Sequence, residues 1–328
     1  MSVTLLDMTA VSVVIPTYNR PSFLAGAVRT VLDQTHDELE VIVVDDGSSS
    51  SYASETVDEF PSVVTCIEHE TNKGLSAARN TGIAAADGEY IAFLDDDDRW
   101  AETKLADQVA ALEAAPESGL ATCLCVSVSP DGDPVHVESS APSGDLSDAI
   151  LRKNLIGSPS RVLVRREALD QVGGFDETLP TKQDWDLYLR LCQEWHVAAV
   201  PDHLCFRTAH ESMSSSPAAI ERDYAAVLKK HEKLIHERGY LGAAKASIDE
   251  RAGRAYLGTG ELRSARQSLK RALDAEPTKR RAILLALAYT HPAVADAAIS
   301  LTRSLRLLFG TEQVTREEIV TQLEYDAM

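Results

Sequence analysis

Four consecutive aspartates, Asp95 to Asp98, follow directly after the apolar run Tyr90 to Leu94. Carboxylates crowded at the end of a strand repel one another unless a cation lies among them. Mg²⁺ or Mn²⁺ suits that position, because these ions take oxygen ligands, commonly one or two carboxylates together with substrate phosphates. With 51 acidic residues in the chain, a run of four acids arises by chance with a probability of roughly 0.2. The place of the run after a strand is therefore what indicates a metal site.

A second acidic pair, Asp45-Asp46, follows the apolar run Val41 to Val44 and precedes Gly47-Ser48. One interpretation is a solvated turn in which Gly47 adopts a positive φ. The other is a binding loop, because an aspartate at a strand end can accept hydrogen bonds from a nucleobase imide or a ribose hydroxyl. Arg79 has the same two interpretations, a surface charge on a helix or a guanidinium that pairs bidentately with a phosphate.

The elements that must position these residues alternate between strands and helices, which predicts a mostly parallel sheet. Ligands of such sheets bind outside the carboxyl ends of the strands, so Pro16-Thr17-Tyr18, Asp45-Asp46 and Asp95 to Asp98 are expected to converge. The predicted strands are Val11 to Ile15, closed by Pro16, then Val41 to Val44, Val63 to Ile67 and Tyr90 to Leu94, and the predicted helices are Pro21 to Gln34 and Leu75 to Ala86.

The rest of the chain divides into an irregular middle and a helical end. Prolines and glycines from Pro130 to Gly144 predict loops, and a helix is expected from Asp184 to Glu194. From Ser216 onward the Ala/Leu/Arg/Glu-rich segments predict helices only, and Gly253 to Pro277 resembles one tetratricopeptide-type hairpin. We therefore expect a catalytic domain at residues 1–215 and a helical region at residues 216–328.

The amino-acid composition limits the classes of partner that the protein is expected to bind. A net charge of −19 argues against nucleic acid or anionic lipid as the main partner. The acidic surface resembles that of proteins from salt-loving cells. Five cysteines without a CxxC pair predict neither a disulfide framework nor a zinc site. We find no signal sequence and no apolar stretch of about 18 residues, so a cytoplasmic location is expected.

Four segments in this order resemble family 2 glycosyltransferases, which have the GT-A fold. They are Val13-Val-Ile-Pro-Thr-Tyr-Asn-Arg20, Val43-Val-Asp-Asp-Gly-Ser48, Asn72-Lys-Gly-Leu-Ser-Ala-Ala-Arg-Asn80 and Phe93-Leu-Asp-Asp-Asp-Asp98. The likeness continues through Gly173-Gly-Phe-Asp176 and Gln183-Asp-Trp-Asp186 to about His210, nearly two thirds of the chain.

The resemblance implies a role for each matching residue. Pro16, Thr17 and Tyr18 would border the nucleoside, Asp46 would bond the base, Arg79 would approach the donor, Asp95 and Asp96 would lie near the ribose and diphosphate, and Asp97 and His210 would hold the metal. Asp184 would act as general base, although Gln183 replaces the glutamate usual before it. Without the resemblance, Asp184 is interpreted as a helix cap.

The implied reaction is transfer of a sugar, with inversion, from a UDP- or GDP-sugar to a hydroxyl of a glycan, lipid-linked or polysaccharide acceptor, assisted by Mg²⁺ or Mn²⁺. An amphipathic segment with Arg303 and Leu305 to Leu308 suggests peripheral membrane contact or packing on the catalytic domain. The alternatives are a nucleotidyltransferase, a receiver-like binding module and a catalytically inactive scaffold. A dehydrogenase is disfavoured, because no GxGxxG follows a strand.

Overall fold

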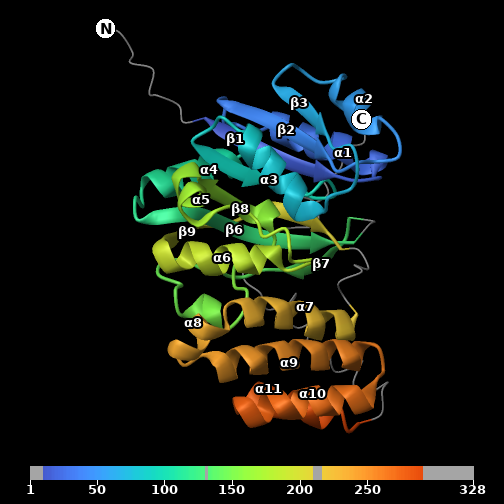
Figure 1. The fold of residues 1–328 in the computed structure, drawn as a ribbon, viewed down its shortest axis with the longest axis vertical. Helices are drawn as coiled ribbons and strands as arrows, with labels where there is room; N and C mark the ends of the chain where they lie inside the picture. Colours follow the sequence, from blue (N-terminus) through green and yellow to red (C-terminus); the bar gives the residue numbers. More distant parts are fainter. Residues whose placement is uncertain (1–9, 130–131, 210–215, 291–328) are drawn as a thin grey trace.

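The computed structural model describes residues 10–129, 132–209 and 216–290, which form a sheet flanked by helices and a stack of further helices on one side (Figure 1). The strands of the described residues are β1 (Val11–Thr17), β2 (Leu39–Asp45), β3 (Val64–Glu68), β4 (Tyr90–Phe93), β5 (Arg99–Trp100), β6 (Ser118–Val128), β7 (Pro134–Val137), β8 (Val162–Arg165) and β9 (His196–Thr208). Their order in the sheet is β3-β2-β1-β4-β8-β6-β9-β5, and β7 pairs with β6.

The sheet is mixed, whereas the sequence predicted a mostly parallel one. β3, β2, β1 and β4 are parallel neighbours, as expected. β8 is antiparallel to both β4 and β6. Parallel neighbours need a crossover, usually a helix, but residues 138–161 reach β8 through loops and short 3₁₀ turns, so the chain runs back beside β6.

β1 is buried on both faces, which explains its uninterrupted apolar sequence. Val14 packs on one side of the sheet, and Val13 and Ile15 pack on the other. The strand continues past Pro16 to Thr17, further than predicted. Pro16 is tolerated because β4 pairs with β1 only as far as Val14, so the proline nitrogen faces no neighbouring strand.

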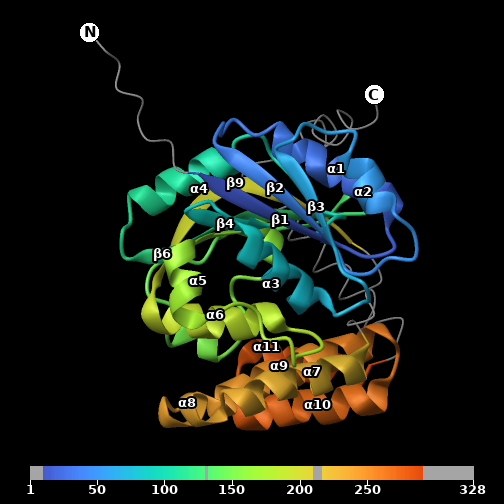
Figure 2. The same ribbon diagram turned by 45° about the horizontal axis from the view of Figure 1, so that its top comes forward.

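Helices cover both faces of the sheet (Figure 2). One face carries α1 (Pro21–Leu32), α2 (Tyr52–Val57) and α4 (Lys104–Glu113). The other carries α3 (Leu75–Ala85), α5 (Arg166–Val172) and α6 (Gln183–Glu194). The sequence predicted α1, α3 and α6 but missed α2, α4 and α5, of which α2 is a short helix in a polar segment.

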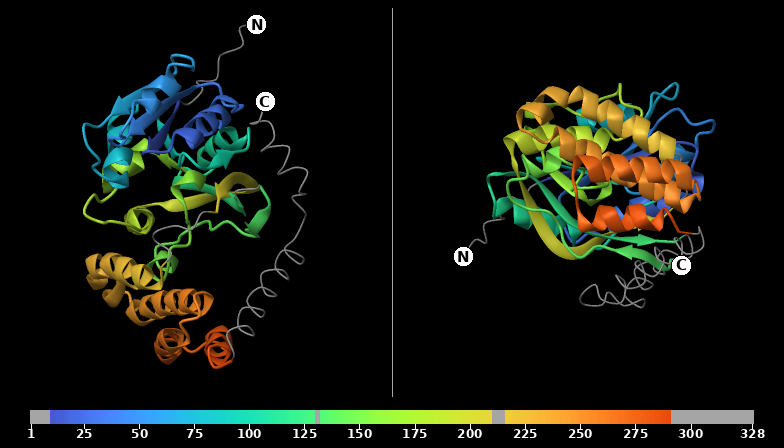
Figure 3. Two further views of the ribbon diagram at one scale, coloured as in Figure 1. Left: turned by 90° about the vertical axis from the view of Figure 1, so that its right-hand side faces the viewer. Right: turned by 90° about the horizontal axis from the view of Figure 1, so that it is seen from below.

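The described residues after Ser216 contain helices only, which confirms that prediction. They form α7 (Pro217–Lys230), α8 (Glu232–Glu237), α9 (Leu241–Gly258), α10 (Leu262–Ala275) and α11 (Lys279–Leu287). These helices stack beneath α6 (Figure 3). α9 and α10 pack so closely that a Cβ on Gly253 would lie 2.6 Å from Leu269 Cγ. The tetratricopeptide-like nature of this pair stays a prediction.

Two further expectations concern what the chain lacks. All five cysteines are free thiols, and burial raises the pKa of Cys66, Cys123 and Cys192 to about 12, which favours the protonated and less reactive form of these thiols. Within the described ranges, none of the helices combines the length and apolar character that crossing a bilayer requires. The segment Arg303 to Leu308 lies outside the described residues.

Candidate active site

The carboxyl ends of β1, β2 and β4 meet at one edge of the sheet, as the alternating pattern predicted. The amide of Asp46 donates to the carbonyl of Thr17 over 2.9 Å, and the amide of Leu94 donates to Val14 over 3.0 Å. The Thr17 hydroxyl, at the end of β1, donates to Asp96 Oδ2 over 2.6 Å and lies 2.7 Å from the Tyr52 hydroxyl. Thr17 therefore ties the first motif to the acidic cluster, while Tyr18 beside it is 45% exposed.

Each carboxylate of the acidic cluster has a different environment. Asp95 accepts a 2.5 Å hydrogen bond from Arg79 Nη2. Asp96 is 1% exposed, and burial raises its pKa to about 6 against the opposing effect of the Arg20 guanidinium. Asp97 accepts from Arg20 Nη1 over 2.8 Å.

Asp98, the fourth aspartate, serves the fold more than the site. Burial, followed by repulsion from Asp95, raises its pKa to about 8. Its Oδ2 lies 3.7 Å from Arg207 Nε, and its Oδ1 accepts from the amide of Thr208 over 3.3 Å. Asp98 thus joins the cluster to the end of β9.

Arg20 is a site residue that the sequence reasoning did not single out, although it ends the first motif. Its guanidinium contacts both Asp96 and Asp97. These two carboxylates therefore converge on a cation in the structure itself. The described residues contain no group of three His, Cys, Asp or Glu side chains with metal-ligand geometry. A pair of carboxylates fits Mg²⁺ or Mn²⁺ bound jointly with phosphate oxygens. His210 lies outside the described residues.

Asp46 organises the loop before α3. Its carboxylate accepts hydrogen bonds of 2.8 Å from the amides of Lys73 and Gly74 and lies 2.8 Å from His69 Nδ1. Gly47 has a φ of 75°, and a Cβ there would approach the carbonyl carbon of Thr71 to 2.4 Å, so only glycine fits. The loop is thus built around Asp46. Nothing in the sequence around His69 marked it as a partner.

Arg79 points from α3 into the acidic edge. Its side chain is 3% exposed, and its guanidinium carbon lies 5.2 Å from the centre of the Phe175 ring. Besides its bond to Asp95, it has a buried Nε without a hydrogen-bond partner in the described residues. The surface-charge interpretation of Arg79 is therefore wrong, since a buried guanidinium needs anionic partners.

Asp184 lies in the first turn of α6, after Lys182, which adopts a left-handed conformation with a φ of 61°. Its Oδ2 accepts a 2.8 Å hydrogen bond from Asn154. Burial raises the pKa of Asp184 above the ordinary value, although the Trp185 amide, Lys182 and Arg79 each lower it. A half-buried carboxylate with a raised pKa is a better proton acceptor than a solvated one. Asn154, in an irregular loop, carried no sequence signal.

The comparisons with known proteins begin with a family match. Residues 12–173 match the model of glycosyl transferase family 2. The putative teichuronic acid biosynthesis glycosyltransferase TuaG of Bacillus subtilis is 31% identical, over 68% of this chain and 89% of its own length. An uncharacterized glycosyltransferase of Haemophilus influenzae is 29% identical, over 69% of this chain and 78% of its own length.

Two solved structures have the same fold. S. aureus TarS 1-349 in complex with UDP-GlcNAc superposes with a TM-score of 0.59 and 20% identity, covering 90% of this chain and 91% of that one. The mannosyltransferase PcManGT from Pyrobaculum calidifontis, in complex with GDP-Man and Mn²⁺, superposes with a TM-score of 0.58 and 22% identity. The match covers 93% of this chain and 88% of that one. The GT-A fold expected from the sequence is confirmed. With the motifs gathered at one sheet edge and a relative matched over most of its length, the chain belongs to the family 2 glycosyltransferases.

Proposed function

We propose that the protein transfers a sugar from a UDP- or GDP-sugar, with inversion, to a hydroxyl of a glycan, lipid-linked or polysaccharide acceptor. The observation that carries the proposal is the meeting of Asp46, Arg79 and the aspartates 95–97 at the edge where β1, β2 and β4 end. The neighbouring structures with UDP-GlcNAc and GDP-Man support a sugar nucleotide as donor. An E. coli relative, 36% identical over 32% of this chain, is named as a glucosyltransferase acting on a diphosphoundecaprenol-linked sugar, which supports a lipid-linked acceptor.

The donor would lie along this edge. Pro16, Thr17 and Tyr18 border the nucleoside, with the exposed Tyr18 ring offering a stacking surface. Asp46 accepts from the base while its bonds to the loop before α3 hold it in place. Arg79, Asp95 and Asp96 face the diphosphate and ribose, and the unpartnered Nε of Arg79 supports a role in binding a phosphate.

Asp97, together with His210, would hold a divalent cation. The oxygen donors and the convergence of Asp96 and Asp97 on Arg20 fit Mg²⁺ or Mn²⁺, and the neighbour PcManGT contains Mn²⁺. When bound, such an ion neutralises charge on the departing diphosphate. Arg20 must then yield part of its contact with these two carboxylates.

Asp184 supplies the proton-accepting group. The acceptor hydroxyl gives its proton to the Asp184 carboxylate, its oxygen forms a bond to the anomeric carbon, and the bond from that carbon to the diphosphate breaks. Attack opposite the leaving group inverts the configuration. Asn154 and the first turn of α6 orient the carboxylate for this step.

Calorimetric titration of the full chain with UDP- and GDP-sugars, with and without Mn²⁺, tests the proposal. We expect one donor to bind, with an affinity that rises when Mn²⁺ is added, and we expect Asp97→Asn to remove most of that gain. An NMR spectrum of the glycosylated product should show inverted configuration. Retained configuration, or a folded chain that binds neither donor, contradicts the proposed reaction.

Two further properties belong to the proposal. Residues 1–215 form the catalytic domain and residues 216–328 a helical region. The enzyme acts in the cytoplasm, and at the inner face of the membrane when its acceptor is lipid-linked.

A further inference from the structure

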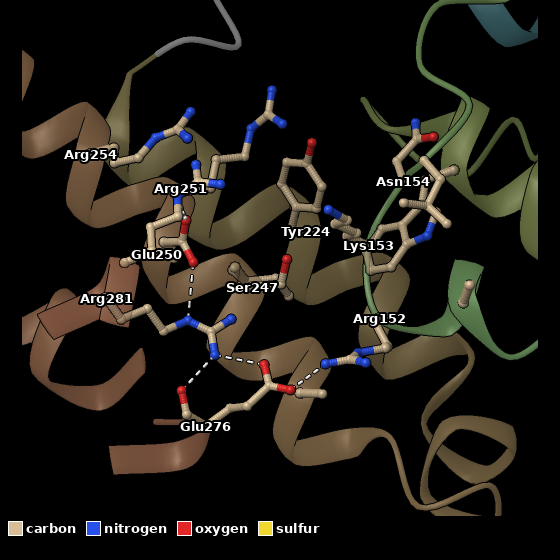
Figure 4. A pocket seen from close by; sticks show the side chains of 16 residues that line it. Arg152, Lys153, Asn154, Tyr224, Ser247, Glu250, Arg251, Arg254, Glu276 and Arg281 are labelled. Atoms are coloured by element: carbon tan, nitrogen blue, oxygen red, sulfur yellow. Dashed lines mark hydrogen bonds and ion pairs between the residues drawn. The ribbon is translucent and has the colours of Figure 1, made fainter. Parts of the chain in front are cut away.

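A cavity of about 570 Å³ lies between the catalytic part and the helical region. Its walls come from five separate parts of the chain: the loop residues 152–155, Trp185 of α6, Tyr224 of α7, residues of α9, and Glu276 with residues of α11. Figure 4 shows Arg254, Arg251, Tyr224, Lys153 and Asn154 along one side, and a network that joins Arg281, Glu250, Glu276 and Arg152 along the other. The volume suits a small-molecule site.

The cavity is cationic although the protein is strongly acidic. The charged side chains that line it are six basic ones, Arg152, Lys153, Arg251, Arg254, Arg280 and Arg281, and two carboxylates, Glu250 and Glu276. The lining therefore has a formal charge of +4 in a chain of −19. An excess of cations in one concave place, on a protein with 51 acidic residues, favours an anionic ligand there.

Both carboxylates of the cavity already have cationic partners. Arg281 Nε lies 3.0 Å from Glu250, Arg280 Nε lies 3.1 Å from Glu250, and Arg281 Nη1 lies 2.6 Å from Glu276. Arg251 and Lys153, on the opposite side, make no ion pair with any other residue of the described ranges. The guanidinium carbon of Arg251 instead lies 5.3 Å from the centre of the Tyr224 ring. These two cations are placed for an external anion.

The cavity is separated from the proposed general base, Asp184, by Asn154. Asn154 lines the cavity and donates its 2.8 Å hydrogen bond to Asp184. Trp185, the next residue, also lines it, and its ring centre lies 5.5 Å from that of Tyr224. Lys182 Nζ lies 5.2 Å from the Tyr224 ring. A ligand seated between Arg251 and Lys153 thus has Asp184 just beyond Asn154.

We propose that this cationic cavity is the acceptor subsite, and that it binds an oxyanion group of the acceptor so that a neighbouring hydroxyl meets Asp184. The inference rests on the proposed function of Asp184. Guanidinium groups pair with both phosphate and carboxylate, so the acceptor class is a phosphate-bearing or an acidic saccharide. The helical region is then part of the active site, because Arg251 and Tyr224 belong to it.

The test measures anion binding on the full chain by calorimetry, with the donor site filled by saturating UDP or GDP, whichever binds. The probes are inorganic phosphate, glucuronate and glucose at constant ionic strength. Phosphate or glucuronate should bind and glucose should not, and the tighter of the two anions identifies the group that the acceptor carries. The double substitution Arg251→Gln with Lys153→Gln should weaken anion binding by about tenfold or more, since it removes two charge-assisted contacts.

Arg263→Gln is the matched control, because Arg263 is exposed on α10 and does not line the cavity. It should leave anion binding unchanged. An unchanged nucleotide affinity in the double variant shows that the chain remains folded. Equal anion affinity in the double variant and the wild type, or glucose binding as well as the anions, overturns the proposal. Failure of UDP and GDP to bind counts against the proposed function instead, and the anion titration is then run without nucleotide.

Discussion

At the residue scale, the position of the Arg20 guanidinium in the acidic cluster is the feature that most constrains the chemistry. Asp96 is 1% exposed and has Arg20 and Thr17 as partners. A carboxylate buried in this way is costly without a counter-ion. Arg20 therefore stabilises the fold in the state that has no metal, and under the proposed function it would compete with a divalent ion for Asp96 and Asp97.

Arg20→Gln should lower the free energy of unfolding by about 1–3 kcal/mol in the absence of metal, because it leaves a buried carboxylate without its charged partner. Added Mn²⁺ should then raise the melting temperature of the variant by more than that of the wild type. Thermal unfolding with and without Mn²⁺ measures both effects. Arg29→Gln, an exposed arginine on α1, is the control. If Mn²⁺ raises the melting temperature of the variant and of the wild type equally, Arg20 does not compete with the metal ion.

Asp184 should give transfer a pH dependence. Its pKa is raised by burial, and Lys182, Arg79, the Trp185 amide and Asn154 oppose the rise. A base must be deprotonated to work, so kcat/KM should fall on the acid side at a higher pH than for a solvated aspartate. Lys182→Gln removes a charge that lowers this pKa and should move the acid limb further upward. Asp184→Asn should reduce transfer by roughly 10²–10⁴-fold. If Lys182→Gln leaves the acid limb of the kcat/KM profile at the same pH, the assignment of Asp184 as the base is contradicted.

At the scale of elements, α6 joins the proposed base to the helical region. Asp186, one turn into the helix, is fully buried and has three basic residues as partners: Arg190 at 2.9 Å, Lys230 at 2.6 Å and His231 at 2.7 Å. Lys230 and His231 belong to the end of α7 and the residue after it, so this cluster fixes α7 against α6. It thereby sets one wall of the cationic cavity.

Asp186→Asn should destabilise the protein by about 3 kcal/mol at neutral pH, because it breaks a buried ionic cluster. Burial raises the pKa of Asp186, but hydrogen bonds from His231, Lys230 and Arg190 outweigh it and hold that pKa well below the usual range. The stabilisation that ionised Asp186 contributes is therefore complete above the pKa of an aspartate in the unfolded chain, about 4, and is lost as pH falls below that value. Urea unfolding at pH 7 and pH 3 should show a difference between variant and wild type that shrinks in acid. A difference that is the same at both pH values would contradict the ionic origin.

The elements that the sequence predicted are those with strong local patterns. β1, β2, β3 and β4 are apolar runs ended by polar residues, and α1, α3 and α6 have helical periodicity, so each was placed within a few residues. β6, β8 and β9 were missed, because the irregular segments between them obscured the pattern and their pairing depends on distant partners.

The residues of the candidate site likewise divide into those that a local sequence pattern predicted and those that it did not. Asp46 and Asp95 to Asp97 could be found because they directly follow buried strands. Arg20, His69 and Asn154 could not, since their contacts cross 76, 23 and 30 residues respectively. The roles assigned to all these residues stay predictions.

At the scale of the whole molecule, the helical region and the catalytic part share a hydrophobic core. Trp185, Leu187 and Leu191 of α6 belong to the same buried cluster as Tyr224 of α7 and Ile248 of α9. The helices after residue 216 therefore support α6, the helix that carries Asp184.

Ending the chain at residue 215 should lower the melting temperature by roughly 10 °C or more, because it exposes several large apolar side chains of α6. Thermal unfolding followed by circular dichroism compares the shortened and the full chain. If residues 1–215 melt at the temperature of the full chain, the shared core contributes nothing to the catalytic part.

The cavity walls have an evolutionary consequence. The segment that matches the family ends at residue 173, while Tyr224, Ser247 and Arg251 come from helices beyond it. Substitutions on α7 and α9 could then redirect the enzyme to a new acceptor without disturbing the strand ends that would hold the donor. Descendants of one ancestral transferase could in this way diversify the acceptors they use while inheriting the same donor-binding strand ends.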